Sequence, residues 1–459
     1  MGLSLEILGK EPLPESYGIF PGVTLTVCPT QAFKVGYLSM LLPVPLRRER
    51  APMYSLLLSV LRRGTVRYPT IRCLNQRLDE LYATPYSLGN DAVGGWQCLG
   101  FSAEILEESY LPEKLDLTGE ILDIMCEMLF HPLCDGDGVL SRHYTASEKK
   151  LMTDALRAIR NHPAAYAMTC FQEAFYEYDA CGYLLCGSED RIAGFTAEAL
   201  TDVWKELLQQ APLCLFYVGG MDPERLQALV KERLGRCLSA VGRAVSDGDG
   251  VFSEVARSRP LPSPVHWEGV KRLQDTLEAG QSHLIFGFHA GVTVGMPEFG
   301  AMMLCNEILG VSPVSLLFTH VREERSLCYS CTSEYYIDRG DLVISVGIDA
   351  SSRQEAEKAV LDQVQAIRKG AFTDAQWEAA RRSLESSYAQ VEDSPKAIAG
   401  FYGLRRRFGM EERVSDCRMA FRRVTREDVQ KVAEKLELSM IYFLEGTGTV
   451  GEAEEEDGD

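Results

Sequence analysis

The sequence predicts an α+β protein built from two similar domains. At 459 residues the chain exceeds the size that one hydrophobic core normally serves. Strand-like segments alternate with long helical ones and with hairpins, a pattern that favours α+β layering over a doubly wound parallel sheet. A capped helix followed by a strand recurs in the second half of the chain. This recurrence indicates two duplicated α/β-sandwich domains.

The recurring helix begins at a threonine in both halves. Thr196 opens a helical pattern that leads into a strand-like segment over 213–218, and Thr425 opens another that leads into 439–444. Threonine is a favoured N-cap because its hydroxyl accepts a hydrogen bond from a free backbone N–H. Three further positions match at the same offset of 229 residues: Glu198, Leu200 and Val203 against Glu427, Val429 and Val432.

A helix followed by a hairpin also occurs in each half. In the first half, apolar residues at helical spacing predict a helix over 70–82, and strands follow over 84–91 and 93–104. In the second half, Ser312 and Pro313 predict a helix start with proline at the first helical position. The stripe that follows is Val314, Leu317, Phe318 and Val321, and the predicted strands then cover 328–337 and 342–348.

The predicted boundaries follow from these elements and from local composition. We expect an N-terminal domain over 1–241 and a C-terminal domain over 273–447. The Gly-, Ser- and Pro-rich stretch over 242–272 is typical of a linker. The acidic tail over 448–459 is typical of a disordered segment.

Bulk properties limit the partners. A net charge of −19 argues against nucleic acid, whose phosphates need a basic face, and is compatible with cationic peptides. The N-terminus lacks the basic-then-apolar pattern of an export signal, and no apolar run has the length of a membrane span. We therefore expect a cytoplasmic protein whose scattered cysteines are reduced and mostly buried.

Two segments show a family resemblance. They are LLFTHVREERSLCYSCTS over 316–333, and LRRGTVRYPT followed by LNQRLDELYA over 61–83. With the duplicated halves, they resemble the pitrilysin/insulinase metallopeptidases, the inverzincins, and more narrowly the YfmF-type bacterial members that lack the zinc motif. The resemblance implies a metallopeptidase/LuxS-like fold whose two domains form half of a clamshell.

The zinc motif of that family, HxxEH on a helix just before Gly-Thr, is absent here. Anchoring the comparison on Gly64-Thr65 places Ser55 and Ser59 at the two histidine positions and Leu58 at the glutamate position. No histidine lies between residues 1 and 130. The helix that carries the third ligand in the family corresponds to 147–159, with the ligand position near Asp154 or Ala155. We expect no metal or other cofactor in this chain, and zinc in a partner subunit.

The family's substrate-binding arginine and tyrosine are present as Arg322 and Tyr329, seven residues apart. The resemblance implies that they donate hydrogen bonds to the scissile carbonyl oxygen of a bound peptide, as an oxyanion hole does. The alternative is that Arg322 belongs to a solvated charged face and that Tyr329 is an ordinary strand aromatic.

Three other groups have plainer interpretations. His283 and His289 are six residues apart and predict two polar residues on a partly exposed strand face. The arginines 405–407 predict an exposed helix face, with contact to a partner or a peptide carboxylate as the alternative. Cys328 and Cys331 are three apart and would point to opposite faces of a strand, which argues against redox pairing.

The function that the resemblance implies is that of a non-catalytic subunit in a heterodimeric zinc metallopeptidase. The partner would be an HxxEH-containing subunit of the same family, and the substrate a peptide, with no nucleic acid and no membrane span involved. Peptide processing in bacteria, with a link to elongation factor P modification, is part of the same expectation. The alternative is a structural or assembly scaffold, or a peptide-binding module of this fold, without a role in hydrolysis.

Overall fold

The computed structural model describes residues 13–177, 182, 185–246 and 269–448. Most of the predicted linker over 242–272 lies outside these residues, as does nearly all of the predicted tail over 448–459. None of the described helices is both long and apolar enough to cross a membrane.

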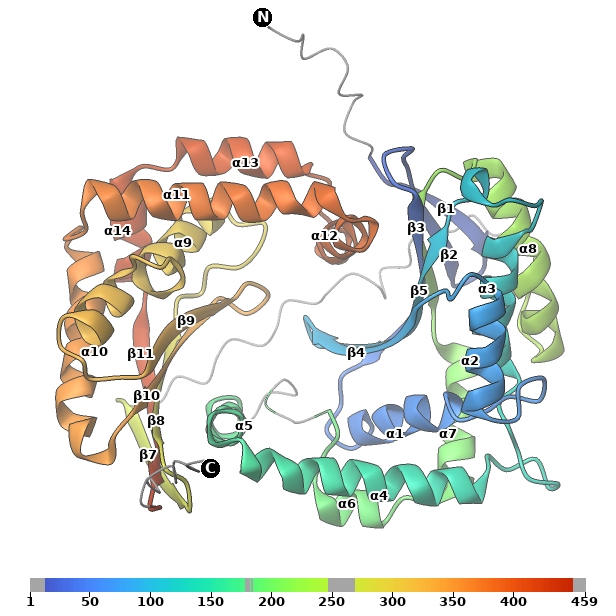
Figure 1. Ribbon diagram of the computed structural model, residues 1–459, viewed down its shortest axis with the longest axis horizontal. Coiled ribbons are helices and arrows are strands. Elements are labelled where there is room, and N and C mark those ends of the chain that lie inside the picture. Colours follow the sequence, from blue (N-terminus) through green and yellow to red (C-terminus); the bar gives the residue numbers. More distant parts are fainter. Residues whose placement is uncertain (1–12, 178–181, 183–184, 247–268, 449–459) are drawn as a thin grey trace, which may run out of the picture. The chain divides into compact units, whose positions relative to one another are not determined.

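The chain divides into two compact units, and each takes a segment from the opposite half of the sequence. Unit 1 comprises Met1–Leu156, Leu184–Pro260 and Gln390–Val414, and unit 2 comprises Arg157–Tyr183, Leu261–Ala389 and Ser415–Asp459. Each unit holds one mixed sheet flanked by helices, which confirms the predicted α+β class with two similar domains (Figure 1).

The sheet of unit 1 has six strands in the order β1-β2-β6-β3-β5-β4. Their bounds are β1 (Glu15–Phe20), β2 (Val23–Pro29), β3 (Val35–Pro45), β4 (Tyr86–Val93), β5 (Trp96–Leu106) and β6 (Leu213–Gly219). The β2–β6 pair is parallel and all other pairs are antiparallel. The β4–β5 hairpin turns at Gly94 and Gly95, both at positive φ, a conformation that glycine adopts without steric cost.

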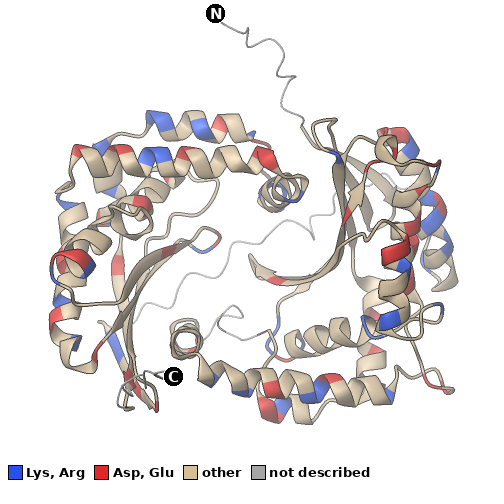
Figure 2. Ribbon diagram, in the orientation of Figure 1, with Lys and Arg blue, Asp and Glu red and all other residues tan. Residues whose placement is uncertain are grey.

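The main core beside this sheet is formed with fully buried residues of α1 (Ala51–Leu61), α2 (Ile71–Glu80), α3 (Leu117–Phe130), α7 (Ala197–Gln210) and α8 (Pro223–Ala240). Two further helices follow in this half of the chain, α4 (Arg142–Ala158) and α6 (Glu189–Ala193), and α6 contacts α1. Thr70 and Thr196 cap α2 and α7 through their hydroxyls, so the predicted helix starts there are confirmed. Figure 2 shows acidic and basic residues interspersed along the helices, while the strands carry few of them.

The sheet of unit 2 has five strands in the order β7-β11-β8-β10-β9. Their bounds are β7 (Lys271–Leu277), β8 (Ser282–His289), β9 (Ser330–Tyr336), β10 (Asp341–Ile348) and β11 (Glu437–Gly446). The helices around it are α5 (Pro163–Phe175), α9 (Phe299–Asn306), α10 (Arg353–Arg368), α11 (Asp374–Ala389), α13 (Val414–Arg423) and α14 (Arg426–Glu434). Thr425 caps α14 in a capping box with Asp428, as its match to Thr196 predicts.

The predicted helix start at Ser312-Pro313 is wrong by three residues. Pro313 lies in a turn that follows the π-helical segment Glu307–Val311, and the next helix begins at Leu316. The Ser315 N–H donates to the Ser312 carbonyl and closes this turn. Proline suits the second position of a turn as well as the first turn of a helix, so the sequence signal was ambiguous.

The internal repeat also includes α5 and a later helix, each of which belongs to the unit formed mainly by the other half of the sequence. In the first half, α4, a 3₁₀ turn and then α5 follow one another, and in the second half α11, a 3₁₀ turn and then α12 (Pro395–Arg407) do the same. Both α5 and α12 begin with proline. Within unit 2, α5 packs on β8 and β11, and within unit 1, α12 packs on β3 and β6. Each sheet is therefore covered on its second face by a helix from the other half of the sequence.

Candidate functional site

The two serines at the histidine positions of the zinc motif are engaged in hydrogen bonds within unit 1. The Ser55 hydroxyl donates to the Leu185 carbonyl at 2.6 Å and accepts from the Asn90 side-chain amide at 2.8 Å. The Ser59 hydroxyl donates to the Ser55 carbonyl one turn earlier at 3.2 Å. Both hydroxyls are thus used by the fold itself.

An amide network continues from Ser55. The Gln97 side-chain amide donates to Asn90 Oδ1 at 2.7 Å and to the Ala51 carbonyl at 3.1 Å. All of these partners are neutral, whereas a zinc site needs imidazole, thiolate or carboxylate ligands. Among the residues that the structure describes, no three His, Cys, Asp or Glu side chains are placed to hold a metal ion.

The glutamate position of the motif has become part of the core. Leu58 is 5% exposed and belongs to the main hydrophobic cluster of unit 1. The Gly64-Thr65 anchor is structurally determined, since a Cβ at Gly64 would lie 2.5 Å from a backbone carbonyl oxygen. A leucine side chain accepts no proton, so this position has no general base.

An ion pair joins the segment just after α1 to α4, the helix that corresponds to the predicted third-ligand helix. Arg63 lies one turn beyond Ser59, and its guanidinium bonds to the carboxylate of Glu148 on α4. Asp154 and Ala155, the predicted third-ligand positions, are exposed on the same helix.

Arg322 and Tyr329 both lie exposed on unit 2. Arg322 belongs to the π-helical segment Phe318–Glu323, and its guanidinium stacks on the Phe318 ring at 4.8 Å. The chain then turns through Ser326, whose φ is +52°. Tyr329 comes just before β9 and is 61% exposed.

A carboxylate that the sequence did not single out positions the tyrosine. The Tyr329 hydroxyl donates to Asp349 at 3.1 Å, and this hydrogen bond raises the pKa of Tyr329. The Tyr329 backbone N–H donates to the Gly347 carbonyl, which anchors the residue to the end of β10. Asp349 lies twenty residues further along the chain, and only the β9–β10 pairing brings it here.

The prediction that Cys328 and Cys331 point to opposite strand faces is wrong. β9 begins at Ser330, so Cys328 lies before the strand and the two-residue alternation does not apply to it. Both thiols are buried, and they hydrogen-bond to each other, which lowers the pKa of Cys328.

The expected partly exposed face for His283 and His289 is also wrong. β8 is the central strand of unit 2 and is buried along its whole length. Burial lowers the pKa of His283. His289 Nδ1 lies 2.6 Å from Asp341, which also accepts a hydrogen bond from the Tyr176 hydroxyl. The α5 helix covers this face, and the local sequence does not show that.

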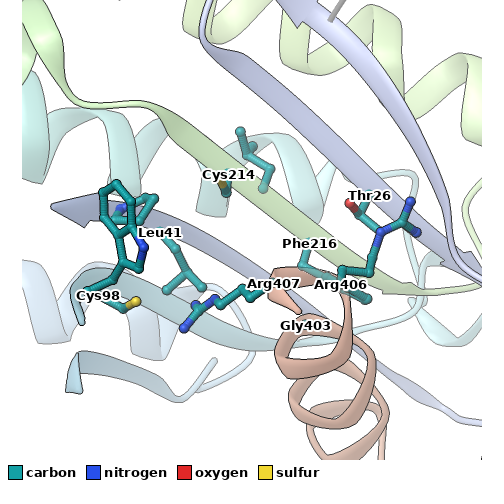
Figure 3. A pocket seen from close by; sticks show the side chains of 11 residues that line it. Thr26, Leu41, Cys98, Cys214, Phe216, Gly403, Arg406 and Arg407 are labelled. Atoms are coloured by element: carbon teal, nitrogen blue, oxygen red, sulfur yellow. The ribbon is translucent and has the colours of Figure 1, made fainter. Parts of the chain in front are cut away.

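The arginines of α12 do not form an exposed helix face. Arg405 is 4% exposed, with its guanidinium 3.6 Å from the centroid of the Phe401 ring. Figure 3 shows Arg406 and Arg407 beside a pocket over the sheet of unit 1. Its other lining residues are mainly apolar and include Leu41, Cys98, Cys214 and Phe216. Arg406 donates to the Pro14 carbonyl, and burial lowers its pKa.

The chain is similar to known proteins of one peptidase family. Residues 194–384 match the family described as the Peptidase M16 inactive domain. The chain is 25% identical over 426 residues to the probable inactive metalloprotease YmfF of Bacillus subtilis strain 168, covering 93% of this chain and 96% of that one. The predicted resemblance to inactive members of this metallopeptidase family is thus confirmed, although the relative is named YmfF and the prediction named the YfmF type.

Solved structures match over nearly the full length. A conserved protein from Enterococcus faecalis V583 has a TM-score of 0.83 at 22% identity, covering 94% of this chain and 98% of that one. A peptidase M16 inactive domain from Pseudomonas fluorescens has a TM-score of 0.74 at 18% identity, with 95% and 99% covered. At these identities the match shows that the fold is shared.

Proposed function

Because this chain belongs to the M16 peptidase family as a homologue of its inactive members, we propose that it is the non-catalytic subunit of a heterodimeric zinc metallopeptidase. An HxxEH-containing subunit of the same family would be the partner and would supply zinc, its ligands and the general base. Zinc in that partner would activate the attacking water. This chain would contribute Arg322, Tyr329 and part of the wall around the peptide.

The observation that carries the proposal is the contrast between the two halves of the inherited site. The zinc-motif positions are occupied by a closed hydrogen-bond network and by the core residue Leu58. Arg322 and Tyr329 instead remain at the surface. An aromatic side chain 61% exposed contributes little to packing. Among the described residues, no carboxylate forms an ion pair with Arg322, so its donors are available.

The chemistry of the pair suits a carbonyl oxygen that gains negative charge. A guanidinium N–H and a phenol O–H are both donors, and donors already in place stabilise such an oxyanion at little reorganisation cost. Asp349 holds the phenol in one position through its hydrogen bond. The phenol oxygen would stay in place while its proton turns from Asp349 to the substrate oxygen, so Asp349 would act as a positioning residue.

The test is reconstitution with an HxxEH-containing subunit. We expect Arg322→Ala and Tyr329→Phe to lower turnover of a peptide by about 100-fold to 1,000-fold each, the usual effect of losing one oxyanion donor. Complex formation, followed by analytical ultracentrifugation, should not change. Arg325→Ala and Tyr110→Phe are matched controls, since both residues are exposed. Unchanged turnover in both test variants would refute the clamp role.

The cellular part of the proposal is supported by the family resemblance alone. In this proposal the heterodimer would act in a bacterial cytoplasm, and its peptide processing would be linked to elongation factor P modification. Mass spectrometry of elongation factor P from cells lacking this chain tests the link. An unaltered modification pattern would remove that link and leave the subunit proposal standing.

The hydrogen bond from Tyr329 to Asp349 favours one alternative. It commits the phenol proton within the chain, as expected of a scaffold or peptide-binding module without a hydrolytic role. Such a module would bind peptide saturably as an isolated chain, measured by fluorescence anisotropy, and the Arg322 and Tyr329 variants would leave turnover of a reconstituted mixture unchanged.

A further inference from the structure

A pair of thiols lies in the outer helical layer of unit 1, away from the positions discussed above. Cys126 lies on α3 and Cys237 on α8, and these two helices pack against each other (Figure 1). Cys126 is 3% exposed and Cys237 is half-buried. Both line one cavity, together with His131, which follows directly after α3.

Hydrogen bonds distinguish the two sulfur atoms. The Cys126 thiol hydrogen-bonds to Cys237 and is the main cause that lowers the pKa of Cys237 to about 7. Burial opposes this shift, and a hydrogen bond from His131 supports it. The pKa of Cys126 is raised well above its usual range by the same contact and by burial. Cys237 therefore ionises before Cys126, and it is also the more exposed of the two thiols.

The other charged groups around the cavity are compatible with a thiolate. The cavity is also lined by three basic residues, Arg67, Arg233 and Arg236, and by two acidic residues, Asp123 and Glu127. Arg233 forms an ion pair with Asp123 at 2.8 Å. Arg233 also pairs with Asp116 and Arg236 pairs with Glu232, so His131, which lowers the pKa of Cys237, and Glu127, which raises it, are the charged groups that act on this thiol.

Metal binding is a weaker interpretation of the same residues. The cavity holds two thiols, one imidazole and two carboxylates, yet no three such groups in the described part of the chain are positioned for one metal ion. A thiolate next to a second thiol is instead the arrangement used in thiol–disulfide exchange.

We propose that Cys237 is a nucleophilic thiol that reacts with low-molecular-weight disulfides, and that Cys126 is its resolving thiol. The Cys237 thiolate attacks one sulfur of the disulfide RSSR and releases RS⁻, which leaves a mixed disulfide on Cys237. Cys126 then loses its proton and attacks the Cys237 sulfur, releasing the second RS⁻. The protein gains one disulfide between α3 and α8, and RSSR is reduced to two RSH.

The pH dependence of the first step gives a sharp expectation. The thiolate fraction of Cys237 should rise with an inflection near pH 7. A free cysteine peptide titrates near pH 8.5, and nucleophilicity falls with pKa at a Brønsted slope of about 0.4–0.5. Per available thiol, Cys237 should therefore react about sixfold faster than the peptide at pH 6, and about fourfold slower at pH 9. Restricted access would scale both ratios but leave the inflection unchanged.

The experiment uses the full chain, reduced and then mixed with oxidised glutathione, with mass spectrometry of the products. The wild-type chain should lose two free thiols and gain no glutathione, with Cys126 and Cys237 joined. Cys126→Ser should accumulate one glutathione on Cys237, and Cys237→Ser should yield neither product. Cys73→Ser, at another half-buried thiol, is the matched control and should behave as wild type.

Several outcomes would overturn the proposal. They are glutathione on other cysteines with Cys237 unmodified, a rate inflection at pH 8.5 or above, or a Cys126→Ser chain that gives the wild-type product. The wild-type pH profile requires no substitution, so it decides the matter even where a serine variant folds poorly. Far-ultraviolet circular dichroism checks the fold of each variant.

Discussion

The glutamate position of the lost zinc motif gives a direct test of how unit 1 is built. Leu58 is 5% exposed and lies in the main core, so Leu58→Glu, which restores the family's residue, should destabilise the protein. Losing the buried leucine costs about 1.5–3 kcal/mol. Burying a carboxyl group there without partners adds about 1–3 kcal/mol. We expect a total of about 2.5–6 kcal/mol, a large share of a typical stability of about 5–15 kcal/mol.

The control for this prediction is the same leucine-to-glutamate substitution at a surface position. Leu151 is 48% exposed on α4, and glutamate and leucine have similar helix propensities, so Leu151→Glu should change stability by less than about 0.5 kcal/mol. Urea unfolding followed by circular dichroism measures the unfolding free energy of both variants. Comparing the dependence of that free energy on urea concentration detects separate transitions of the two units. A loss below about 1 kcal/mol for Leu58→Glu would refute the reasoning.

The same variant has a pH dependence of known sign. Burial favours the neutral carboxyl, so the pKa of the introduced glutamate should be higher in the folded than in the unfolded chain. The folded state then binds the proton more tightly. The deficit should be smallest below about pH 4.3 and should grow as pH rises towards the raised pKa.

Three further predictions concern single contacts. Asp349→Asn should return the pKa of Tyr329 towards about 10, because the hydrogen bond to Asp349 raises it; NMR titration of labelled tyrosine measures this, and an unaltered pKa would contradict the contact. Glu148→Gln should cost about 2 kcal/mol of unfolding free energy, less than for a fully buried pair because Arg63 is partly exposed; additive effects in a double-mutant cycle with Arg63→Met would show that the pair is not coupled. Gly64→Ala should cost about 1–3 kcal/mol, since its Cβ would meet backbone at 2.5 Å; an unchanged urea midpoint would show that the loop shifts freely.

Local patterns predicted the repeated elements well. Thr196 and Thr425 cap equivalent helices, as their shared offset indicated. An N-cap depends on one side chain and the backbone two or three residues ahead, so the sequence contains the whole interaction. Pro313 shows the limit of such reasoning, because one residue type serves both turn and helix starts.

The part of the candidate site that depends on residue type was predictable from the sequence, and the part that depends on long-range packing was not. Ser55, Leu58 and Ser59 exclude the family's zinc motif by residue type alone. The partners of this segment were not predictable, since Asn90 reaches Ser55 and Glu148 reaches Arg63 only through the sheet and the helix packing of unit 1. Asp349 was missed likewise, because only the β9–β10 pairing brings it to Tyr329.

The sequence by itself determined the duplication, the α+β class, the loss of the zinc motif and the presence of the arginine and tyrosine, because each depends on residue identity at short or constant spacing. The tertiary structure alone decided that Arg405 is buried, that His289 is covered by a helix from the other half of the sequence, and that Cys126 meets Cys237. These outcomes depend on which segments pack together over long sequence distances. Burial, proton affinity and thiol reactivity all follow from that packing.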